Sequence, residues 1–292
     1  MSRAVDRLPT PAHIRDKKVI VVARSRTGTL SLYKALTILG YRTYHGAEVM
    51  ARGVSHLEMF EEALNAKYFG VGKPYGRAEF DKWLADYDAI VEIPAVFLDE
   101  FVEAYPEVPF VHVERDVHKW YVSIMNTLGH SLRDVDEFPL KQLRLIDTFI
   151  DRFCSFHLTV HRIWWHGKAL EDGEDVLKSD YIELNRRVKE IVPQHKLASF
   201  NLEDGFGWEQ LCPVLGQPIP DVSYPTANTP ERFDKMQAGF VRKDMRKAYA
   251  LATTAIIVPT VAMAAWYYYR GRPAHGLAIL RLSLFGRMLS NS

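Results

Sequence analysis

The fold of this 292-residue chain is decided by residues 17–40, which read KKVIVVARSRTGTLSLYKALTILG. Residues 17–23 form a short apolar run that contains Val19, Ile20, Val21 and Val22, and β-branched residues between charge and a turn are typical of a buried parallel strand. From Gly28 onward apolar residues recur at helical spacing, and Gly40 stands where a helix commonly ends. The stretch therefore predicts a strand, a tight loop and a helix.

Further strands are predicted at 87–93, 109–114 and 197–201, and helical patterns follow the first two of these, at 96–104 and 117–128. Strands that alternate with helices favour a parallel sheet with right-handed crossovers. The expected fold class is α/β, a P-loop-type parallel sheet flanked by helices and followed by a C-terminal hydrophobic helix.

Residues 140–193 are expected to be mostly helical, and a short helix is expected at 208–215. Large apolar side chains recur at helical spacing in the first of these stretches. They predict a core stripe that packs on the sheet. The residues of this stripe are Phe149, Phe153, Phe156, Val160 and Trp164.

Composition excludes several classes of protein. A formal net charge of +1 gives no basis for broad nucleic-acid binding, which needs a basic excess. The two cysteines, Cys154 and Cys212, exclude a disulfide framework and favour a reducing compartment. Residues 1–15 are polar and have no secretory signal pattern. No cluster of metal ligands is visible in the sequence.

Residues 248–269, from Ala248 to Tyr269, carry no charge and have basic flanks. About 20 apolar residues suffice to cross a bilayer as a helix. The segment either anchors a cytoplasmic domain to a membrane or packs as a buried helix of the soluble domain. The basic flanks and the aromatic cluster Trp266–Tyr269 favour the anchor, whereas Pro259 and the many alanines and threonines favour the buried helix. The expected organisation is an N-terminal extension (1–16), the main domain (17–247), the apolar segment (248–269) and a tail (270–292).

The loop between the first strand and helix is a candidate anion site. Backbone N–H groups at a helix N-terminus carry partial positive charge, and Gly28 lets a phosphate approach the backbone closely. An NTPase P-loop has a lysine where this chain has Thr29, which argues against ATP or GTP hydrolysis. The residues of the loop are Arg24, Ser25, Arg26, Thr27, Gly28, Thr29, Leu30 and Ser31.

The string from Arg26 to Thr29 resembles the 5′-phosphosulfate loop of P-loop sulfotransferases, and residues 25–35 resemble more closely the fungal-type sulfotransferase-like branch, with Gly-Arg-Thr-Gly-Thr-x-Ser-Leu. The resemblance covers residues 17–233. It places Arg26 where the family has its catalytic lysine. Arginine stays charged in proteins, so a proton-donating role of that lysine is not available here.

A second element of the resemblance is Arg115, at the end of the strand predicted at 109–114, with Ser123 eight positions later. Open α/β sheets bind ligands at the carboxyl ends of their strands. The resemblance implies that these two residues bind the 3′-phosphate of the nucleotide. The C-terminal Arg-Lys-Gly element of cytosolic sulfotransferases has no good match, since Arg242-Lys243 lies beside the apolar segment.

Glu92 follows the strand predicted at 87–93, where the family has its general base. It is the candidate base, provided that burial raises its pKa; the alternative is a structural ion pair with Arg24 or Arg115. His45, after a further short strand, is the second candidate, and His112 is expected in the core.

The resemblance thus implies a sulfotransferase that moves a sulfuryl group from 3′-phosphoadenosine 5′-phosphosulfate to a hydroxyl or amine of a small-molecule acceptor. Arg26 and Glu92 are the expected catalytic residues, and no metal is required. The alternative is a membrane-tethered P-loop protein that hydrolyses nucleotides or has no catalytic activity.

Overall fold

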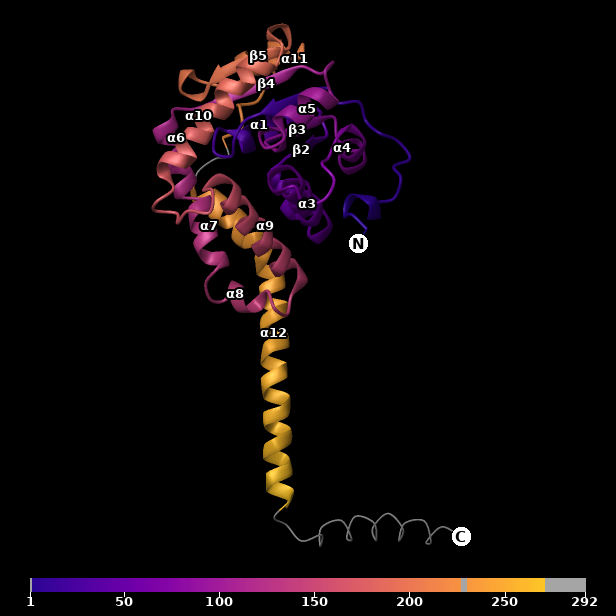
Figure 1. The fold of residues 1–292 in the computed structure, drawn as a ribbon, viewed down its shortest axis with the longest axis vertical. Helices are drawn as coiled ribbons and strands as arrows, with labels where there is room; N and C mark the ends of the chain where they lie inside the picture. Colours follow the sequence, from indigo (N-terminus) through magenta and orange to yellow (C-terminus); the bar gives the residue numbers. More distant parts are fainter. Residues whose placement is uncertain (1, 227–229, 271–292) are drawn as a thin grey trace. The chain divides into compact units, whose positions relative to one another are not determined.

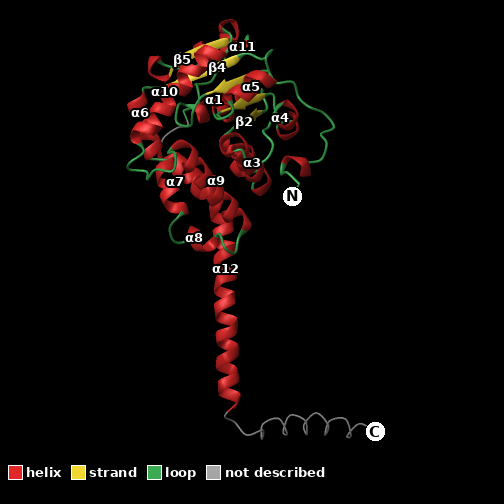
Figure 2. Ribbon diagram, in the orientation of Figure 1, coloured by secondary structure: helices red, strands yellow, loops and turns green. Residues whose placement is uncertain are grey.

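The computed structural model describes residues 2–226 and 230–270, and its strands form one parallel sheet flanked by helices (Figures 1 and 2). The strand order is β2-β3-β1-β4-β5. The strands are β1 (Val19–Val22), β2 (Thr43–Tyr44), β3 (Ala89–Val91), β4 (Phe110–Glu114) and β5 (Leu197–Asn201).

The central strand β1 is buried on both faces, as its run of β-branched residues predicts. It pairs with β3 through Val21 and Val91, and with β4 through Val21 and Val111. The α/β fold and the four predicted strands are confirmed, with ends that differ by at most a few residues.

Helices connect and surround these strands. Before β4 they are α1 (Thr29–Ile38), α2 (Gly46–Ala51), α3 (Val54–Phe69), α4 (Arg77–Trp83) and α5 (Leu98–Ala104). After β4 they are α6 (Val117–Met125), α7 (Leu128–Val135), α8 (Leu140–Leu143), α9 (Thr148–Trp164), α10 (Glu174–Ile191), α11 (Trp208–Leu215) and α12 (Pro230–Arg270).

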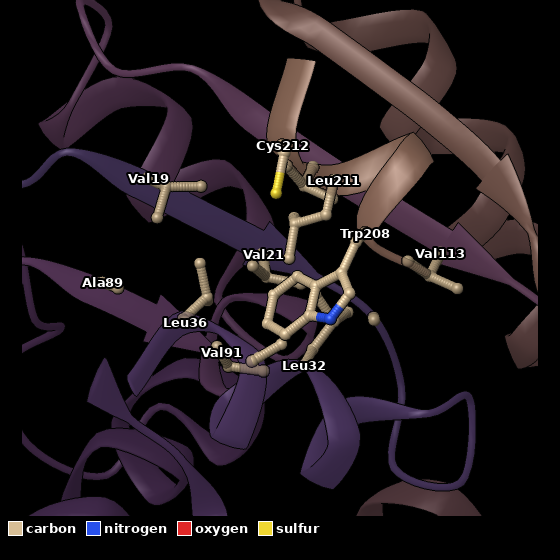
Figure 3. Packing of buried hydrophobic residues seen from close by; sticks show 13 residues of the cluster. Val19, Val21, Leu32, Leu36, Ala89, Val91, Val113, Trp208, Leu211 and Cys212 are labelled. Carbon is tan, nitrogen blue, oxygen red and sulfur yellow. The ribbon is translucent and has the colours of Figure 1, made fainter. Parts of the chain in front are cut away.

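One face of the sheet is covered by α1 and α11. Trp208, Leu211 and Cys212 of α11 point toward Val21 of the sheet and Leu32 of α1 (Figure 3). The Trp208 indole also donates a hydrogen bond from Nε1 to the carbonyl of Val222 at 2.7 Å. The segment after β5 is therefore part of the same core as the loop between β1 and α1.

The structure corrects two predictions about the helices. The helix predicted at 117–128 ends at Met125, and α7 begins at Leu128 after a break at Thr127. The Thr127 hydroxyl donates to the carbonyl of Ser123 at 2.7 Å, and this local side-chain bond competes with helix continuation. The predicted helix at 96–104 begins only at Leu98, after a 3-10 turn.

The aromatic stripe is buried as predicted, except for the half-buried Phe149. The expectation that it packs on the sheet was wrong, because α9 packs mainly against α3 and α7. A helix that is apolar along one face needs only an apolar neighbour, and helical spacing does not specify whether that neighbour is a sheet or another helix. His112 is fully buried in β4, as expected.

The carboxyl ends of β1 and β4 meet at one edge of the sheet. The chain proceeds from β1 to β2 and β3 on one side and then to β4 on the other side of β1. In parallel sheets the crevice beside such a reversal is the usual ligand site. It lies between the loop after β1 and the residue after β4.

By their contacts the described residues form two compact units, which divide between Asp244 and Met245 within α12. In the first unit, the backbone N–H of Ala4 donates to Glu62 at 2.6 Å and Val5 is buried, so the predicted N-terminal extension packs on the domain. The predicted tail, beyond Arg270, lies outside the described residues.

Candidate active site

The loop between β1 and α1 turns through two left-handed backbone positions. The φ angles are 74° at Arg26 and 87° at Gly28. Arginine adopts such a conformation at a cost, which is typical of functional loops. The Arg24 carbonyl accepts hydrogen bonds from the Thr27 N–H at 3.2 Å and from the Thr27 hydroxyl at 2.7 Å. These bonds close the turn.

Helix α1 begins directly after this turn, at Thr29, and has no side-chain cap. The first N–H groups of a helix have no intrahelical partner, so an uncapped helix end offers them to an anion. A methyl group at Gly28 would lie 3.2 Å from Leu202 Cδ1, so this side of the turn is tightly packed. The predicted anion loop therefore ends at an uncapped helix N-terminus.

Arg26 is almost completely buried, at 3% exposure, and is tied to the helix after β4. Its Nε donates to Ser123 Oγ at 3.1 Å, and the Trp120 indole donates to the Ser25 carbonyl at 2.9 Å. Ser123 and Trp120 are three residues apart on α6, so they lie on one face of it. Hydrogen bonds to this face of α6 therefore hold the loop in place.

Arg115, directly after β4, also contacts the loop. Its Nη1 donates to the Arg26 carbonyl at 3.2 Å, and its Nε lies 3.4 Å from Glu203 Oε1, poorly aligned for a hydrogen bond. The Tyr181 hydroxyl accepts from the Arg115 N–H at 2.8 Å and donates to its carbonyl at 3.2 Å. The structure thus brings the predicted residues Arg26, Arg115 and Ser123 into one bonded group.

Glu92 follows β3 and also has a left-handed φ, of 73°. Its Oε2 lies 3.0 Å from His45 Nε2 and accepts a bond from the Gly46 N–H at 3.3 Å. His45 Nδ1 accepts from the Ala47 N–H at 3.0 Å, so the ring proton lies on Nε2, facing Glu92 but poorly aligned with it. The alternative was an ion pair of Glu92 with Arg24 or Arg115. Among the described residues, Glu92 instead lies beside His45.

The pKa of Glu92 moves opposite to the expectation. Burial alone would raise it, but the contact with His45 and the hydrogen bonds from Ser25 and the Gly46 N–H outweigh burial and lower the pKa below the usual 4.5. Glu92 is therefore ionised at neutral pH. The two ring nitrogens of His45 face the Ala47 N–H and Glu92. Of His45 and Glu92, Glu92 is therefore the one whose oxygen lone pairs can accept a proton from a ligand.

Gly46 leaves room for this carboxylate in its observed position. A methyl group on Gly46 would lie 2.6 Å from Glu92 Oε2, which is closer than real contacts allow. Any side chain at position 46 would therefore displace the carboxylate from His45.

The loop after β1 and the pair of His45 and Glu92 line a cavity of about 130 Å³. Arg24, Arg26, His45 and Glu92 supply its polar wall. The remaining lining is mainly apolar and comes from α3, α9 and the start of α12, including Phe60, Phe156, Trp164, Met236 and Phe240. A few polar groups in a mainly apolar lining are typical of pockets for small organic ligands.

The sequence analysis did not identify part of the apolar lining of this cavity. It assigned Phe156 and Trp164 to the core, because a stripe at helical spacing looks the same whether it faces a helix or a cavity. It also missed Trp120, Tyr181 and Glu203, which hold Arg115 and the loop, and for these no sequence signal was present. Among residues 2–226 and 230–270, no group of three or more His, Cys, Asp or Glu side chains could hold a metal ion.

Comparison with known proteins identifies the family of this chain. The model of the sulfotransferase domain family matches residues 18–233. The chain is 27% identical over 265 residues to the Ava biosynthesis cluster protein M of Aspergillus versicolor, covering 87% of this chain and 97% of that protein. The sulfotransferase of Alicyclobacillus acidocaldarius matches in structure at 13% identity and a TM-score of 0.39, over 82% of this chain and 96% of that one. Because the family model matches most of the chain, including the loop and strand ends described above, the chain belongs to the sulfotransferase domain family and is a transferase of that family.

Proposed function

We propose that the chain transfers a sulfuryl group from 3′-phosphoadenosine 5′-phosphosulfate to the hydroxyl of a small apolar acceptor. One observation carries the proposal: buried Arg26, at the left-handed turn, is bonded through its side chain to Ser123 and through its carbonyl to Arg115. A phosphate cradle and a strand-end arginine are thereby combined into one anion site, beside a cavity that contains a carboxylate.

In this proposal the 5′-phosphate lies against the N–H groups of the turn and the start of α1, from Gly28 to Ser31. The 3′-phosphate binds Arg115 and Ser123. Arg115 already faces Glu203, so the phosphate replaces this carboxylate as its anionic partner. An arginine fork binds a phosphate through two parallel hydrogen bonds, which favours the exchange.

The acceptor oxygen attacks sulfur in line, the new O–S bond forms, and the bond from sulfur to the bridging phosphate oxygen breaks. Glu92 receives the proton of the acceptor hydroxyl. By analogy with phosphoryl transfer through a loose transition state, the proton leaves late, so a weakly basic carboxylate suffices. Arg26 stabilises the negative charge on the sulfuryl oxygens and on the departing phosphate.

The donor assignment is tested by thermal unfolding with 3′-phosphoadenosine 5′-phosphate, ADP and ATP. A ligand at 100 times its Kd stabilises a protein by about 2.7 kcal/mol, which is easily seen. We expect stabilisation by the 3′-phosphorylated nucleotide, and loss of this preference in Arg115→Ala. The matched control is Lys119→Ala, which removes a cation that is also near Glu203 but more exposed. Equal stabilisation by ADP in the wild type would refute the assigned 3′-phosphate site.

For Arg26 we predict that Arg26→Ala lowers kcat by about 10²–10³, as expected for loss of a group that stabilises transition-state charge, with a much smaller effect on nucleotide Kd. Arg26→Lys keeps the charge and should retain part of the rate. Steady-state kinetics and calorimetry measure the two effects. Equal losses in kcat and in nucleotide affinity would show that Arg26 only binds the donor.

For Glu92 we predict that Glu92→Gln keeps nucleotide binding and abolishes transfer. The low pKa of Glu92 means that the carboxylate is charged above 4.5 and is lost as a base only when the pH falls below that value. The rate should therefore show no loss due to Glu92 between pH 5 and pH 8. Transfer by Glu92→Gln at the wild-type rate would exclude the role.

We also infer that α12 attaches the protein to a membrane. Its segment Ala238–Arg270 is long and apolar enough to cross a bilayer, and only 6% of the most apolar window is buried. Exposed Ile256, Val258 and Trp266 would otherwise face water. Basic residues flank the uncharged stretch: Arg242, Lys243, Arg246 and Lys247 before it and Arg270 after it.

A flotation assay with phospholipid vesicles tests this attachment. Ile257→Lys places a charge within the apolar stretch, which costs about 3 kcal/mol near the centre of a bilayer, so we expect the variant to leave the vesicle fraction. Ile182→Lys, at a similarly exposed isoleucine of α10, is the control and should float with the wild type. Flotation of Ile257→Lys, or no flotation of the wild type, would contradict the inference.

A further inference from the structure

Arg24, the first residue of the loop, has a buried side chain that forms no ion pair with the residues that the structure describes. The residue is 9% exposed, and its Nε and Nη1 form no hydrogen bond with any described residue. Nor does any carboxylate of the described chain form an ion pair with it. Only its carbonyl takes part in the turn, by accepting the bonds from Thr27.

The guanidinium lies on an aromatic ring of the cavity wall. Its central carbon is 4.5 Å from the ring centroid of Trp164, on α9. Stacking on an indole orients a guanidinium and leaves its edge N–H groups available to a ligand. Arg24 and Trp164 line the same cavity as Glu92.

The attraction of neighbouring groups, Tyr68, Asp180 and Tyr181, does not outweigh the burial of this charge, because burial lowers the pKa of Arg24 overall. The hydroxyl of Tyr68 donates to the Val96 carbonyl at 3.0 Å, and burial raises the pKa of Tyr68, so it is a neutral phenol at physiological pH. Asp180 lies 2.9 Å from His166 Nε2. Burial lowers the pKa of Arg24, but a guanidinium remains charged in proteins.

A buried charge without a partner opposes folding, so a protein that retains one commonly uses it to bind an opposite charge. In the proposed function the anionic groups of the donor already have partners, namely the N–H groups of the turn, Arg26 and Arg115. The side chain of Arg24 instead stacks on α9, which supplies much of the apolar wall of the cavity. Its partner is therefore expected to come from the acceptor.

Resting on the proposed function, we propose that the acceptor is an apolar molecule with a carboxylate as well as a hydroxyl, and that Arg24 binds this carboxylate. The ion pair holds one end of the acceptor at Trp164, its apolar body lies against residues such as Phe156 and Val160, and its hydroxyl faces Glu92. Arg24 attracts the carboxylate of the acceptor and Glu92 repels it. These two opposite charges in one cavity favour an acceptor with a carboxylate and also determine which way round it binds.

The experiment compares hydroxyphenylacetate with its neutral isostere, hydroxyphenylacetamide, by calorimetry on the full chain, with and without saturating 3′-phosphoadenosine 5′-phosphate. We expect the wild type to bind the carboxylate roughly tenfold or more tightly than the amide, which is the range of a hydrogen-bonded charge pair. Arg24→Gln should lose the preference for the carboxylate, through loss of carboxylate affinity alone. The matched control is Arg162→Gln, which removes an exposed arginine of α9 that stacks on Phe69 at 4.3 Å.

Arg24→Gln removes an unpaired buried charge and should unfold at no lower temperature than the wild type, so it can be studied as a folded protein. Equal affinity of the wild type for both probes would overturn the proposal, and this comparison needs no variant. Loss of nucleotide affinity in Arg24→Gln with an unchanged preference between the probes would assign Arg24 to the donor and also overturn it. If the proposed function is wrong, the wild type does not bind 3′-phosphoadenosine 5′-phosphate at all, while the carboxylate preference of the cavity is still measured in its absence.

Discussion

The left-handed turn from Arg24 to Gly28 determines where almost every candidate functional group lies. It folds because the Arg24 carbonyl takes two bonds from Thr27 and because α6 and Arg115 hold the Ser25 and Arg26 carbonyls from outside. The cost of a left-handed arginine is thus offset by contacts from the next strand and helix. Without them the turn would relax, and the uncapped end of α1 would no longer face a defined site.

The sequence was a good guide wherever one local pattern has one physical cause. The run Val19–Val22 is apolar on both faces, which specifies a central parallel strand, and α11 was predicted with its observed bounds of Trp208–Leu215. The break at Thr127 was not predicted, because it depends on a hydroxyl that bonds the helix backbone rather than on apolar spacing. The packing of α9 on α3 and α7 depends on tertiary contacts that one helix does not encode.

In the candidate site, too, locally encoded features could be predicted from the sequence, and tertiary contacts could not. The loop and the strand-end residues were predictable, because an anion site needs glycine, hydroxyls and cations in a single turn, and parallel strands end at a common edge. The pairing of His45 with Glu92 was not, since the two residues belong to different strand ends and meet only in the folded sheet. For the same reason the pKa of Glu92 falls rather than rises: its partner outweighs burial, and no sequence pattern identifies that partner.

Gly46 limits how this site can diverge. Because a methyl group at Gly46 would lie 2.6 Å from Glu92 Oε2, positions 46 and 92 share a single volume of space. A larger residue at 46 requires the Glu92 carboxylate to move or a shorter side chain at 92, and either change separates the carboxylate from His45. The two positions therefore constrain each other's evolution, although they are 46 residues apart in the chain. Relatives with another base after β3 are expected to differ also at the start of α2.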